Sequence, residues 1–528
     1  MLVWFVLAPI FIALLLYILS LKKAGSIIAV IVQTGLIVFA WKIFLLSKEG
    51  AIIVRVGDFG SILGITLKAD TLSSVFVLVT SCVFLMAVLY NLNEKTGRLF
   101  WFLLFVWEGL LFGIFLSCDL FNIFVLIEVV TVVVAVFIMF KKDSRSMYDG
   151  MVYLMANTVA VQFYLFGVGY IYKLTGVLDM DSAALAIKSL DKSALVLPFA
   201  LIMTSLSLKC ALMPLFSWLP RAHGSPGAPT VVSAILSGLH IKTGVYLFIR
   251  FQSIFEGVFL HNFFLIAGIV TGIAGFMLAL SQSDIKLILA YSTISQIGMI
   301  MIGLNLSDTY SFTGSLYHII NHTLFKSALF LNAGIIKSIY GTRNLHEISG
   351  VFKRAPLIGV STIMAIMGIT GTPFFNGSIS KYFIMSAANW VITGIIIFLN
   401  LGTITLFIKY SSMLIGPCAS ASEKTGISVS KQIAVLALGI SCLVGGIFGE
   451  QFILFLFSID LRVDTASYLQ KAVFFVLSVA AGFLLYKYFV KKSKLFMRIR
   501  EIDLSFRGIC VSIGAFFAIL LLVFNFFA

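Results

Sequence analysis

The sequence predicts an all-α protein that crosses a membrane many times. Its 528 residues are 60% hydrophobic and only 11% charged, which leaves too little polar surface for a soluble chain of this length. Apolar runs near the roughly 20 residues that span a bilayer cover most of the chain. The net charge of +15 is typical of cytoplasmic loops rich in lysine and arginine. We expect no nucleic-acid binding, because no soluble basic module is present.

The apolar runs predict about sixteen membrane spans. They lie roughly at 2–20, 25–46, 71–91, 99–118, 119–140, 149–173, 194–220, 228–253, 262–281, 287–306, 310–338, 354–386, 389–416, 431–457, 467–489 and 507–527. The first run lacks a basic region and a small-residue cleavage site, so it predicts a retained helix. Residues 51–70 instead alternate, are rich in valine and isoleucine, and turn at Gly57-Asp58, which predicts a short extramembrane β-hairpin.

Positive charges predict the orientation of these spans. With the N-terminus outside, the hairpin and residues 458–464 fall outside and the basic residues between other runs fall inside. The inside residues are Lys22, Lys23, Lys95, Arg98, Lys141, Lys142, Arg145, Arg221, Lys286, Arg343, Lys353, Arg354, Lys424, Lys431, Lys491, Lys492 and Lys494. The alternation holds through every run. We therefore expect a multi-pass protein of the cell (inner) membrane with its N-terminus outside.

Two of the runs contain helix breakers. Pro214 interrupts 194–220, and Pro373 with neighbouring glycines interrupts 354–386, because proline removes a backbone donor and opens a helical turn. Broken helices at corresponding positions of two halves point to a transport site.

The breaks also indicate an internal repeat. Each break falls in the fourth span of a five-span block, one covering 99–253 and the other 262–416. Because five is an odd number, successive blocks must have opposite topology. We predict two inverted five-helix repeats, preceded by residues 1–98 with the hairpin and followed by C-terminal helices in 431–528.

Glu128 and Lys209 are charged residues within apolar runs of the first block. Lys209 has no opposite charge near it in sequence and stands five residues before Pro214. Ionisable groups inside a membrane are costly and are functional sites by default. A nearby ammonium would hold the glutamate ionised. The alternatives are a structural ion pair that locks two helices and a lysine that snorkels to the interface.

Further candidates lie along both blocks. His240 and Lys242 are two positions apart and point in different directions on a helix; His240 is equally compatible with a core histidine. His318, His322 and Lys326 are spaced by four and share one helix face. A zinc site on this face is the alternative, but the lysine and the lack of a third ligand argue against it.

Lys381 follows the second break. Its alternative role is an interfacial lysine at a helix end, but the neighbouring proline and glycines favour water access. The chain contains no nucleotide-binding loop, nucleophile constellation or CxxC pair among its six cysteines. We therefore expect no catalytic site, no cofactor and no metal in this chain.

Five stretches resemble the antiporter-like membrane subunits. They are KCALMPLFSWLPRAH, GAPTVVSAILSGLHIKTGVYLFIRF, SDIKLILAYSTISQIG, HIINHTLFKSALFL and GTPFFNGSISKYFI. This superfamily includes the D subunit of Mrp-type cation/proton antiporters, the proton-pumping subunits of respiratory complex I and matching subunits of membrane-bound hydrogenases. The resemblance covers roughly 60–420 and implies about fourteen core helices with two inverted five-helix repeats. The two extra C-terminal runs depart from the simplest Mrp pattern.

The resemblance implies roles for residues of the first block. The family's fifth-helix glutamate pairs with a lysine on the broken seventh helix, and these positions fall on Glu128 and Lys209. The eighth-helix lysine falls on Lys242, whereas His240 is not carried over. In the second block, the eleventh-helix histidine and lysine fall on His322 and Lys326.

Two further positions complete the set of residues through which we expect ions to move. His318 lies one turn before the eleventh-helix histidine, and Lys381 occupies the position on the broken twelfth helix. We expect an ion-translocating subunit that moves protons, with exchange for Na⁺ left open, alongside other membrane subunits in the lipid bilayer. The alternatives are a pumping module of a redox-driven complex I-like or hydrogenase complex, a non-transporting anchor and a solute transporter. Ionisable groups in both blocks argue against an anchor, and the resemblance argues against a solute transporter.

Overall fold

The structure is a computed structural model that describes residues 2–19, 24–58, 64–94, 96–417, 426–491 and 504–527, with residues 493, 496 and 499. Six of the basic residues used to predict the orientation lie outside the described residues. They are Lys22, Lys23, Lys95, Lys424, Lys492 and Lys494.

The chain forms two compact units. The first comprises Met1–Val232, Leu239–Leu260 and Leu504–Ala528, and the second comprises Ser233–Gly238 and His261–Asp503. The helix at the C-terminus therefore belongs with the first unit, whereas the helices between residues 261 and 503 belong with the second. The four-part division predicted from the sequence stays a prediction.

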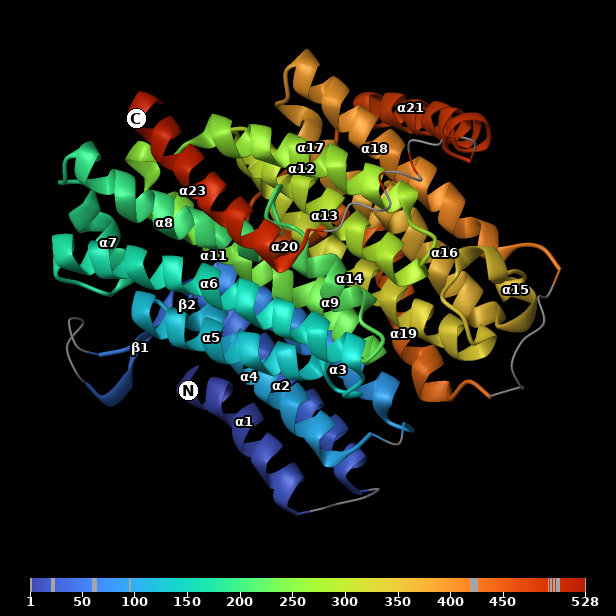
Figure 1. Cartoon of the computed structure of the whole chain (residues 1–528), viewed down its shortest axis with the longest axis horizontal. Coiled ribbons are helices and arrows are strands. Elements are labelled where there is room, and N and C mark those ends of the chain that lie inside the picture. The colour runs from blue at the N-terminus through green and yellow to red at the C-terminus, as the bar shows by residue number, and fades with distance from the viewer. Residues whose placement is uncertain are drawn as a thin grey trace. The chain divides into compact units, whose positions relative to one another are not determined.

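The first unit contains a small hairpin and most of the N-terminal helices (Figure 1). Its elements are α1 (Leu2–Ile18), α2 (Ala24–Glu49), β1 (Ile52–Arg55), β2 (Thr66–Ala69), α3 (Thr71–Asn91), α4 (Arg98–Leu116), α5 (Leu120–Ile138), α6 (Ser144–Thr175), α7 (Met180–Ile187), α8 (Lys192–Lys209), α9 (Trp218–Gly224), α11 (Ile241–Ile254) and α23 (Phe506–Phe527). The short helix α10 (Thr230–Ile235) and a π-helical turn, Leu236–His240, lead into α11.

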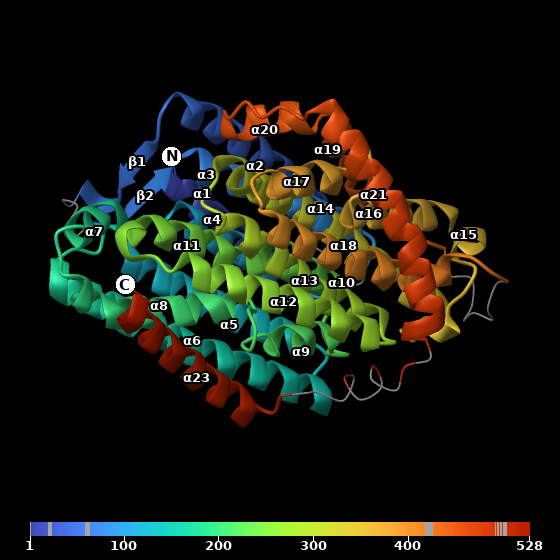
Figure 2. The same ribbon diagram turned by 90° about the horizontal axis from the view of Figure 1, so that it is seen from above.

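The second unit consists of helices joined by loops in its described residues. Its elements are α12 (His261–Ser281), α13 (Ile285–Leu304), α14 (Thr309–Tyr340), α15 (Val351–Arg354), α16 (Pro356–Thr370), α17 (Asn376–Ser386), α18 (Trp390–Ser411), α19 (Val429–Ile447), α20 (Gly449–Phe457) and α21 (Thr465–Leu484). Figures 1 and 2 show α21 beside α18, and α23 beside α8 of the first unit.

The fold class predicted from the sequence is confirmed. The described residues contain 14 helices that are long and apolar enough to cross a membrane, and two shorter apolar helices, Leu2–Ile18 and Pro356–Thr370. Each predicted run contains one of these helices, and both interrupted runs are broken as expected. Sequence reasoning missed α7, because eight residues are too few to show a helical period.

The hairpin forms where it was predicted, but its connection is longer. The strands pair antiparallel, with Ile52 opposite Ala69 and Arg55 opposite Thr66. Gly57 adopts φ 77 within a 3-10 turn that only begins the connection, and residues 59–63 lie outside the described part of the chain. The predicted turn at Gly57-Asp58 is therefore the first part of a wider loop.

The two five-helix blocks share a local structural signature. In each block an aspartate caps the second helix and forms a single antiparallel bridge, Asp119 with Asp179 and Asp284 with Asn344. The same number of residues separates the bridged positions in both blocks. The third helices, α6 and α14, each have 32 residues and end at a left-handed glycine. This correspondence supports the predicted repeat.

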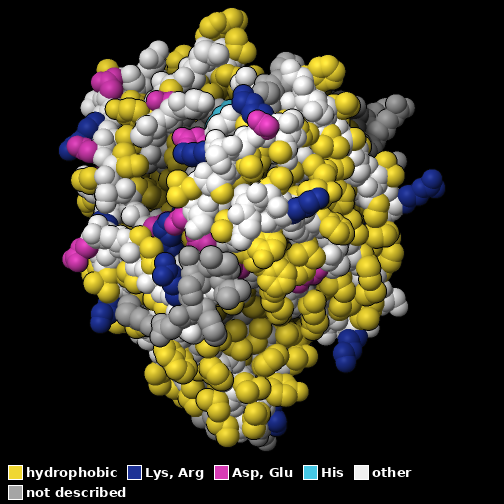
Figure 3. Space-filling view, turned by 90° about the vertical axis from the view of Figure 1, so that its left-hand side faces the viewer, with side chains coloured by type: hydrophobic (Ala, Val, Ile, Leu, Met, Phe, Trp, Pro, Cys, Tyr) yellow, Lys and Arg dark blue, Asp and Glu magenta, His cyan; other side chains and the backbone are white. Residues whose placement is uncertain are grey.

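The outer surface is rich in apolar side chains, as a lipid-facing surface requires. Figure 3 shows one face on which hydrophobic side chains cover wide areas and charged ones are scattered. Trp4, Ile31 and Val38 on the first two helices are each 65% exposed. The chain is a polytopic, membrane-embedded protein.

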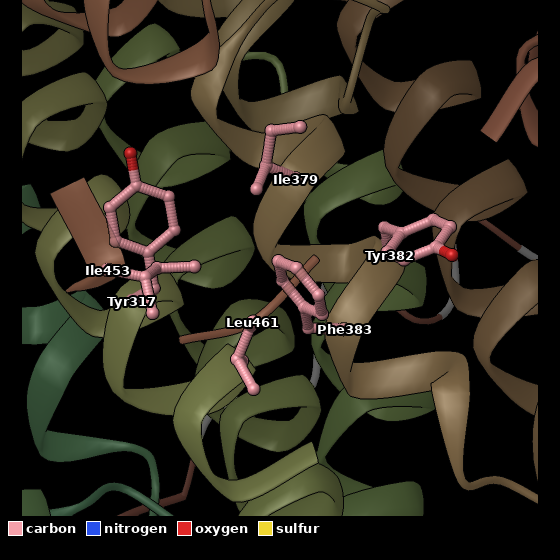
Figure 4. Close-up of a cluster of buried hydrophobic side chains, with 6 residues drawn as sticks. All are labelled: Tyr317, Ile379, Tyr382, Phe383, Ile453 and Leu461. Atoms are coloured by element: carbon pink, nitrogen blue, oxygen red, sulfur yellow. The ribbon is translucent and has the colours of Figure 1, made fainter. Parts of the chain in front are cut away.

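A buried cluster in the second unit holds the helix that follows the second break (Figure 4). Its members are Tyr317, Ile379, Tyr382, Phe383, Ile453 and Leu461. Three of them belong to α17, so apolar packing fixes that short helix against α14 and α20. The Tyr317 hydroxyl also donates a hydrogen bond to the Gly445 carbonyl. Lys381 lies on this anchored helix.

An ion pair joins the start of α3 to α11 within the first unit. Arg250 donates to the Asp70 carboxylate over 2.7 Å, and the same carboxylate accepts from the Ser73 amide as the N-cap of α3. Burial raises the pKa of Asp70, but the hydrogen bond and charge of Arg250 outweigh it and lower the pKa to about 2.

We expect Asp70→Asn to destabilise the detergent-solubilised protein at pH 7 by about 2 kcal/mol, because asparagine keeps the cap but loses the charge. A lowered pKa in the folded state stabilises above the unfolded value, near 4, and the contribution is lost as pH falls through the folded value near 2. Thermal unfolding of both proteins from pH 7 downwards should therefore show a difference that shrinks at low pH. Asp464→Asn is the control, since Asp464 is exposed and caps α21 without an ion pair to any described residue. Equal losses of stability in both variants would contradict a stabilising role of the Arg250–Asp70 ion pair.

Candidate ion-translocation site

Lys209 lies at the first helix break. It is the last residue of α8, where Ala211 turns the chain with a left-handed φ of 53°. Its side chain is 4% exposed, and its Nζ donates to Thr131 Oγ1 and Asn157 Oδ1, both at 3.0 Å. The ammonium is therefore held between α5 and α6 by neutral oxygens, which argues against the snorkelling alternative.

Glu128 lies one helical turn before Thr131 on the same face of α5. It is half-buried and accepts a hydrogen bond from Gln162 Nε2 at 3.2 Å. Within the described residues no ion pair joins it to Lys209. The Lys209 ammonium contacts Thr131 and Asn157 instead, and the pairing of Glu128 with Lys209 stays a prediction.

α11 and the π-helical turn before it carry the other two candidates of the first unit. Lys242 is 1% exposed, and His240 is 3% exposed. The His240 Nε2 and the Tyr153 hydroxyl share a hydrogen bond of 3.0 Å. A β-carbon at Gly244 would come within 2.8 Å of the Lys209 carbonyl carbon, so glycine permits α11 to pack closely against the end of α8.

His318 organises a polar network in the second unit. Its Nδ1 pairs with Ser380 Oγ at 2.9 Å, and its Nε2 pairs with Gln296 Oε1 at 3.1 Å. Gln296 in turn donates to Thr403 Oγ1 at 3.2 Å. Four helices, α13, α14, α17 and α18, thus contribute to one buried chain of hydrogen bonds. Both ring nitrogens of His318 are engaged by side chains, which argues against the zinc alternative.

His322 and Lys326 continue along α14. The ring centroids of His318 and His322 are 6.5 Å apart, as expected for residues one turn apart on a shared face. Lys326 is fully buried; its Nζ donates to the Leu289 carbonyl at 2.9 Å and to the Ser292 hydroxyl. No carboxylate of the described residues lies within ion-pair distance of this ammonium.

Lys381 donates a hydrogen bond to a backbone carbonyl at the second helix break. It is 5% exposed and donates to the Ile369 carbonyl at 2.6 Å and to Asn400 Oδ1 at 2.7 Å. Ile369 belongs to the last turn of α16, where carbonyls have no partner within the helix. A cavity of about 240 Å³ reaches Lys381 and is also lined by Tyr382, Asn400 and Lys471. The lysine is therefore buried against the break, with space for water beside it.

Sequence reasoning missed the neutral partners of these charges. Thr131, Asn157, Gln162, Gln296 and Asn400 hold the charged groups and the central histidine. Single polar residues are common in membrane helices, and only the tertiary structure shows which of them face a charge.

Sequence reasoning also missed Glu108, a fully buried carboxyl in α4. The signal was present, because Glu108 is a lone charge in an apolar run, as Glu128 is.

Buried ammonium groups beside broken membrane helices define a class of polytopic subunits suited to ion movement. Residues 117–408 match the family described as "NADH:quinone oxidoreductase/Mrp antiporter, TM". The D subunit of the Na⁺/H⁺ antiporter of Alkalihalophilus pseudofirmus is 31% identical over 373 residues, covering 68% of this chain and 75% of that protein. The chain belongs to the NADH:quinone oxidoreductase/Mrp antiporter family of membrane subunits.

Other relatives come from both branches of this family. The N subunit of the NADH-quinone oxidoreductase of Desulforudis audaxviator is 29% identical over 423 residues, covering 74% of this chain and 83% of that protein. The Mrp complex from Dietzia sp. DQ12-45-1b contains a chain of the same fold, with TM-score 0.79, 22% identity and coverage of 94% and 99% of the two chains. So does the membrane-bound sulfane sulfur reductase, an archaeal respiratory membrane complex, with TM-score 0.79, 23% identity and coverage of 91% and 99%.

Proposed function

We propose that this protein is an ion-translocating subunit of a multi-subunit membrane complex and that it moves protons through Glu, Lys and His side chains of its membrane helices. The observation that carries the proposal is the position of Lys209. Its ammonium is bound by Thr131 and Asn157, one turn of α5 from Glu128. A lysine side chain is long enough to exchange neutral oxygens for a carboxylate one turn away.

This geometry provides two arrangements that differ in charge. When Lys209 binds Thr131 and Asn157, the side-chain hydrogen bond that Glu128 makes within the described residues comes from the Gln162 amide. When Lys209 moves to Glu128, the pair becomes mutually neutralised, and the neighbouring groups lose the field of a separated charge. Protonation of one group thereby changes the proton affinity of the next, as expected for interacting sites.

The proposed route continues through Lys242, with His240 beside it, and then through His318, His322 and Lys326 to Lys381. The network from Ser380 through His318 to Gln296 supports proton passage within the second unit. The cavity beside Lys381 supports exchange of protons with water at the end of the route. Na⁺ as the exchanged ion is suggested by relatives that are D subunits of Na⁺/H⁺ antiporters.

A test uses the intact complex purified with this chain and reconstituted into vesicles. We expect an imposed Na⁺ gradient to drive proton movement, detected with a pH-sensitive dye. A complex that responds to neither a Na⁺ gradient nor a redox substrate would overturn the proposal.

A second candidate is a pumping module of a redox-driven complex, favoured by the relative from an NADH-quinone oxidoreductase. The two candidates differ in their partners. Mass spectrometry of the purified complex should find small membrane subunits alone for an antiporter, and redox subunits for a pump. Proton movement that requires a redox substrate would select the second candidate.

We also propose that the protein resides in the cell membrane with its N-terminus outside. A cysteine placed after Met1 should then react with an impermeant thiol reagent added to intact cells. Lys142→Cys, in the exposed turn between α5 and α6, should react only after the cells are opened. Labelling of both sites from the same side would contradict this topology.

A further inference from the structure

A fully buried carboxyl, Glu108, lies among the N-terminal helices. Glu108 on α4 and Gln33 on α2 are both 0% exposed. Gln33 Nε2 donates to Glu108 Oε1 at 2.6 Å and to the Ser81 carbonyl on α3 at 3.0 Å. Three helices therefore meet at this amide and carboxyl pair.

The pair leaves two oxygens without partners in the described part of the chain. These are Glu108 Oε2 and Gln33 Oε1. No ion pair of the described residues includes Glu108. An uncompensated carboxylate at such a position is strongly destabilising, and each buried polar atom without a partner adds a further cost. Something other than the described side chains must therefore satisfy both oxygens.

A proton on Glu108 and one internal water together give both oxygens a hydrogen-bond partner. The carbonyl oxygen of the acid accepts from the Gln33 amide, as observed, and the hydroxyl at Oε2 becomes a donor. A water between that hydroxyl and Gln33 Oε1 accepts from one and donates to the other. An ionised Glu108 could also accept from such a water, but it would be a buried carboxylate without a countercharge among the described residues, and such a charge is costly.

A metal cation fits the pair less well. Hard cations collect many oxygen ligands, about six to eight for Ca²⁺. Only two oxygens of this pair lack partners among the described residues. A proton needs only one acceptor, Glu108 Oε2. A bridging water then supplies the hydrogen-bond partner of Gln33 Oε1.

We propose that Glu108 and Gln33 form a proton-binding site of the first unit, with the proton on Glu108 Oε2 and an exchangeable water bridging to Gln33 Oε1. The site is separate from the Glu128 and Lys209 site, because its contacts come from α2 and α3 rather than from α6 and α8. It does not depend on the proposed route of translocation.

The helix that carries Glu108 also contacts the start of α11. The neighbouring residue on α4, Trp107, places its ring 5.8 Å from that of His240, in an edge-to-face arrangement. The helix that holds the proton on Glu108 thus also contacts the start of α11, which carries Lys242. A proton held here would thus be a neutral, exchangeable group on a helix that also contacts His240.

Infrared spectroscopy of the intact complex tests the site without measuring transport. We expect the wild type at pH 7 to show the C=O stretch of a protonated carboxyl that is absent in Glu108→Gln. Transfer to D₂O should shift this band, because the proton exchanges through water. Gln33→Leu should move it towards the frequency of a carboxyl without a hydrogen bond.

Two controls separate the site from other carboxyls and from misfolding. Glu128→Gln should leave this band unchanged, and Glu108→Asp should retain a shifted band if the complex assembles. Glutamine matches the size and neutrality of the protonated acid, so Glu108→Gln should fold normally. Identical spectra of the wild type and Glu108→Gln, or a band that does not respond to D₂O, would overturn the proposal. Failure of ion transport in reconstituted vesicles would leave these spectra unaffected, so the two proposals fail separately.

Discussion

Replacing Lys209 with alanine is expected to abolish ion translocation while the protein still inserts and assembles. The substitution removes the ammonium that Thr131 and Asn157 hold at the end of α8. Glu128 then loses the cation that could neutralise it, and no other cation of the described residues forms an ion pair with it. We expect flux to fall by about tenfold or more, equivalent to a barrier higher by about 1.4 kcal/mol or more.

The measurement is proton flux in vesicles that contain equal amounts of assembled complex. Lys188→Ala is the matched control, because the ion pair that Lys188 forms with Glu256 is exposed, and such pairs contribute little. Glu128→Gln should be about as severe as Lys209→Ala, and Glu128→Asp should keep partial activity because it keeps the charge. Near wild-type flux in Lys209→Ala would show that the lysine is structural.

Replacing both His322 and Lys326 with alanine should also reduce ion flux strongly, in this case by interrupting the proposed route within the second unit. Both side chains are buried on α14 in the second unit, and Lys326 is bound by the Leu289 carbonyl and the Ser292 hydroxyl. Without them, Lys381 and the Glu128 and Lys209 groups would remain, but the proposed connection would be lost. We expect flux to collapse even though the groups in both end regions are intact.

The pH profile of this double variant distinguishes a continuous route from two independent pathways. Coupled groups titrate as a set, so any residual flux should show a shifted pH dependence. Lys337→Ala on the same helix is the control, since Lys337 lies in the last turn of α14 and outside the proposed route. Substantial flux with an unchanged profile in the double variant would discard the lateral route and leave the family assignment intact.

Much of the site was predictable because membrane burial makes charge conspicuous. Lys209, Lys326 and Lys381 stand out in apolar runs, and the structure buries all three. The same reasoning applied to α4 would have found Glu108. The contacts of these groups were less predictable. Nothing in the sequence indicated that Thr131 and Asn157 would bind the Lys209 ammonium.

The membrane class, the positions of the apolar helices, the two breaks and the five-helix blocks that we predict to be repeats could all be inferred from the amino-acid sequence. These features follow from local properties: hydropathy over the length of a bilayer, and proline or glycine that cannot continue a helix. The packing of the helices was needed to show which neutral groups bind each charge, such as Asn157 for Lys209 and Asn400 for Lys381. It also placed Gln33 against Glu108. These contacts join residues far apart in the chain or on different helices, and they depend on how helices pack rather than on any periodicity along one helix.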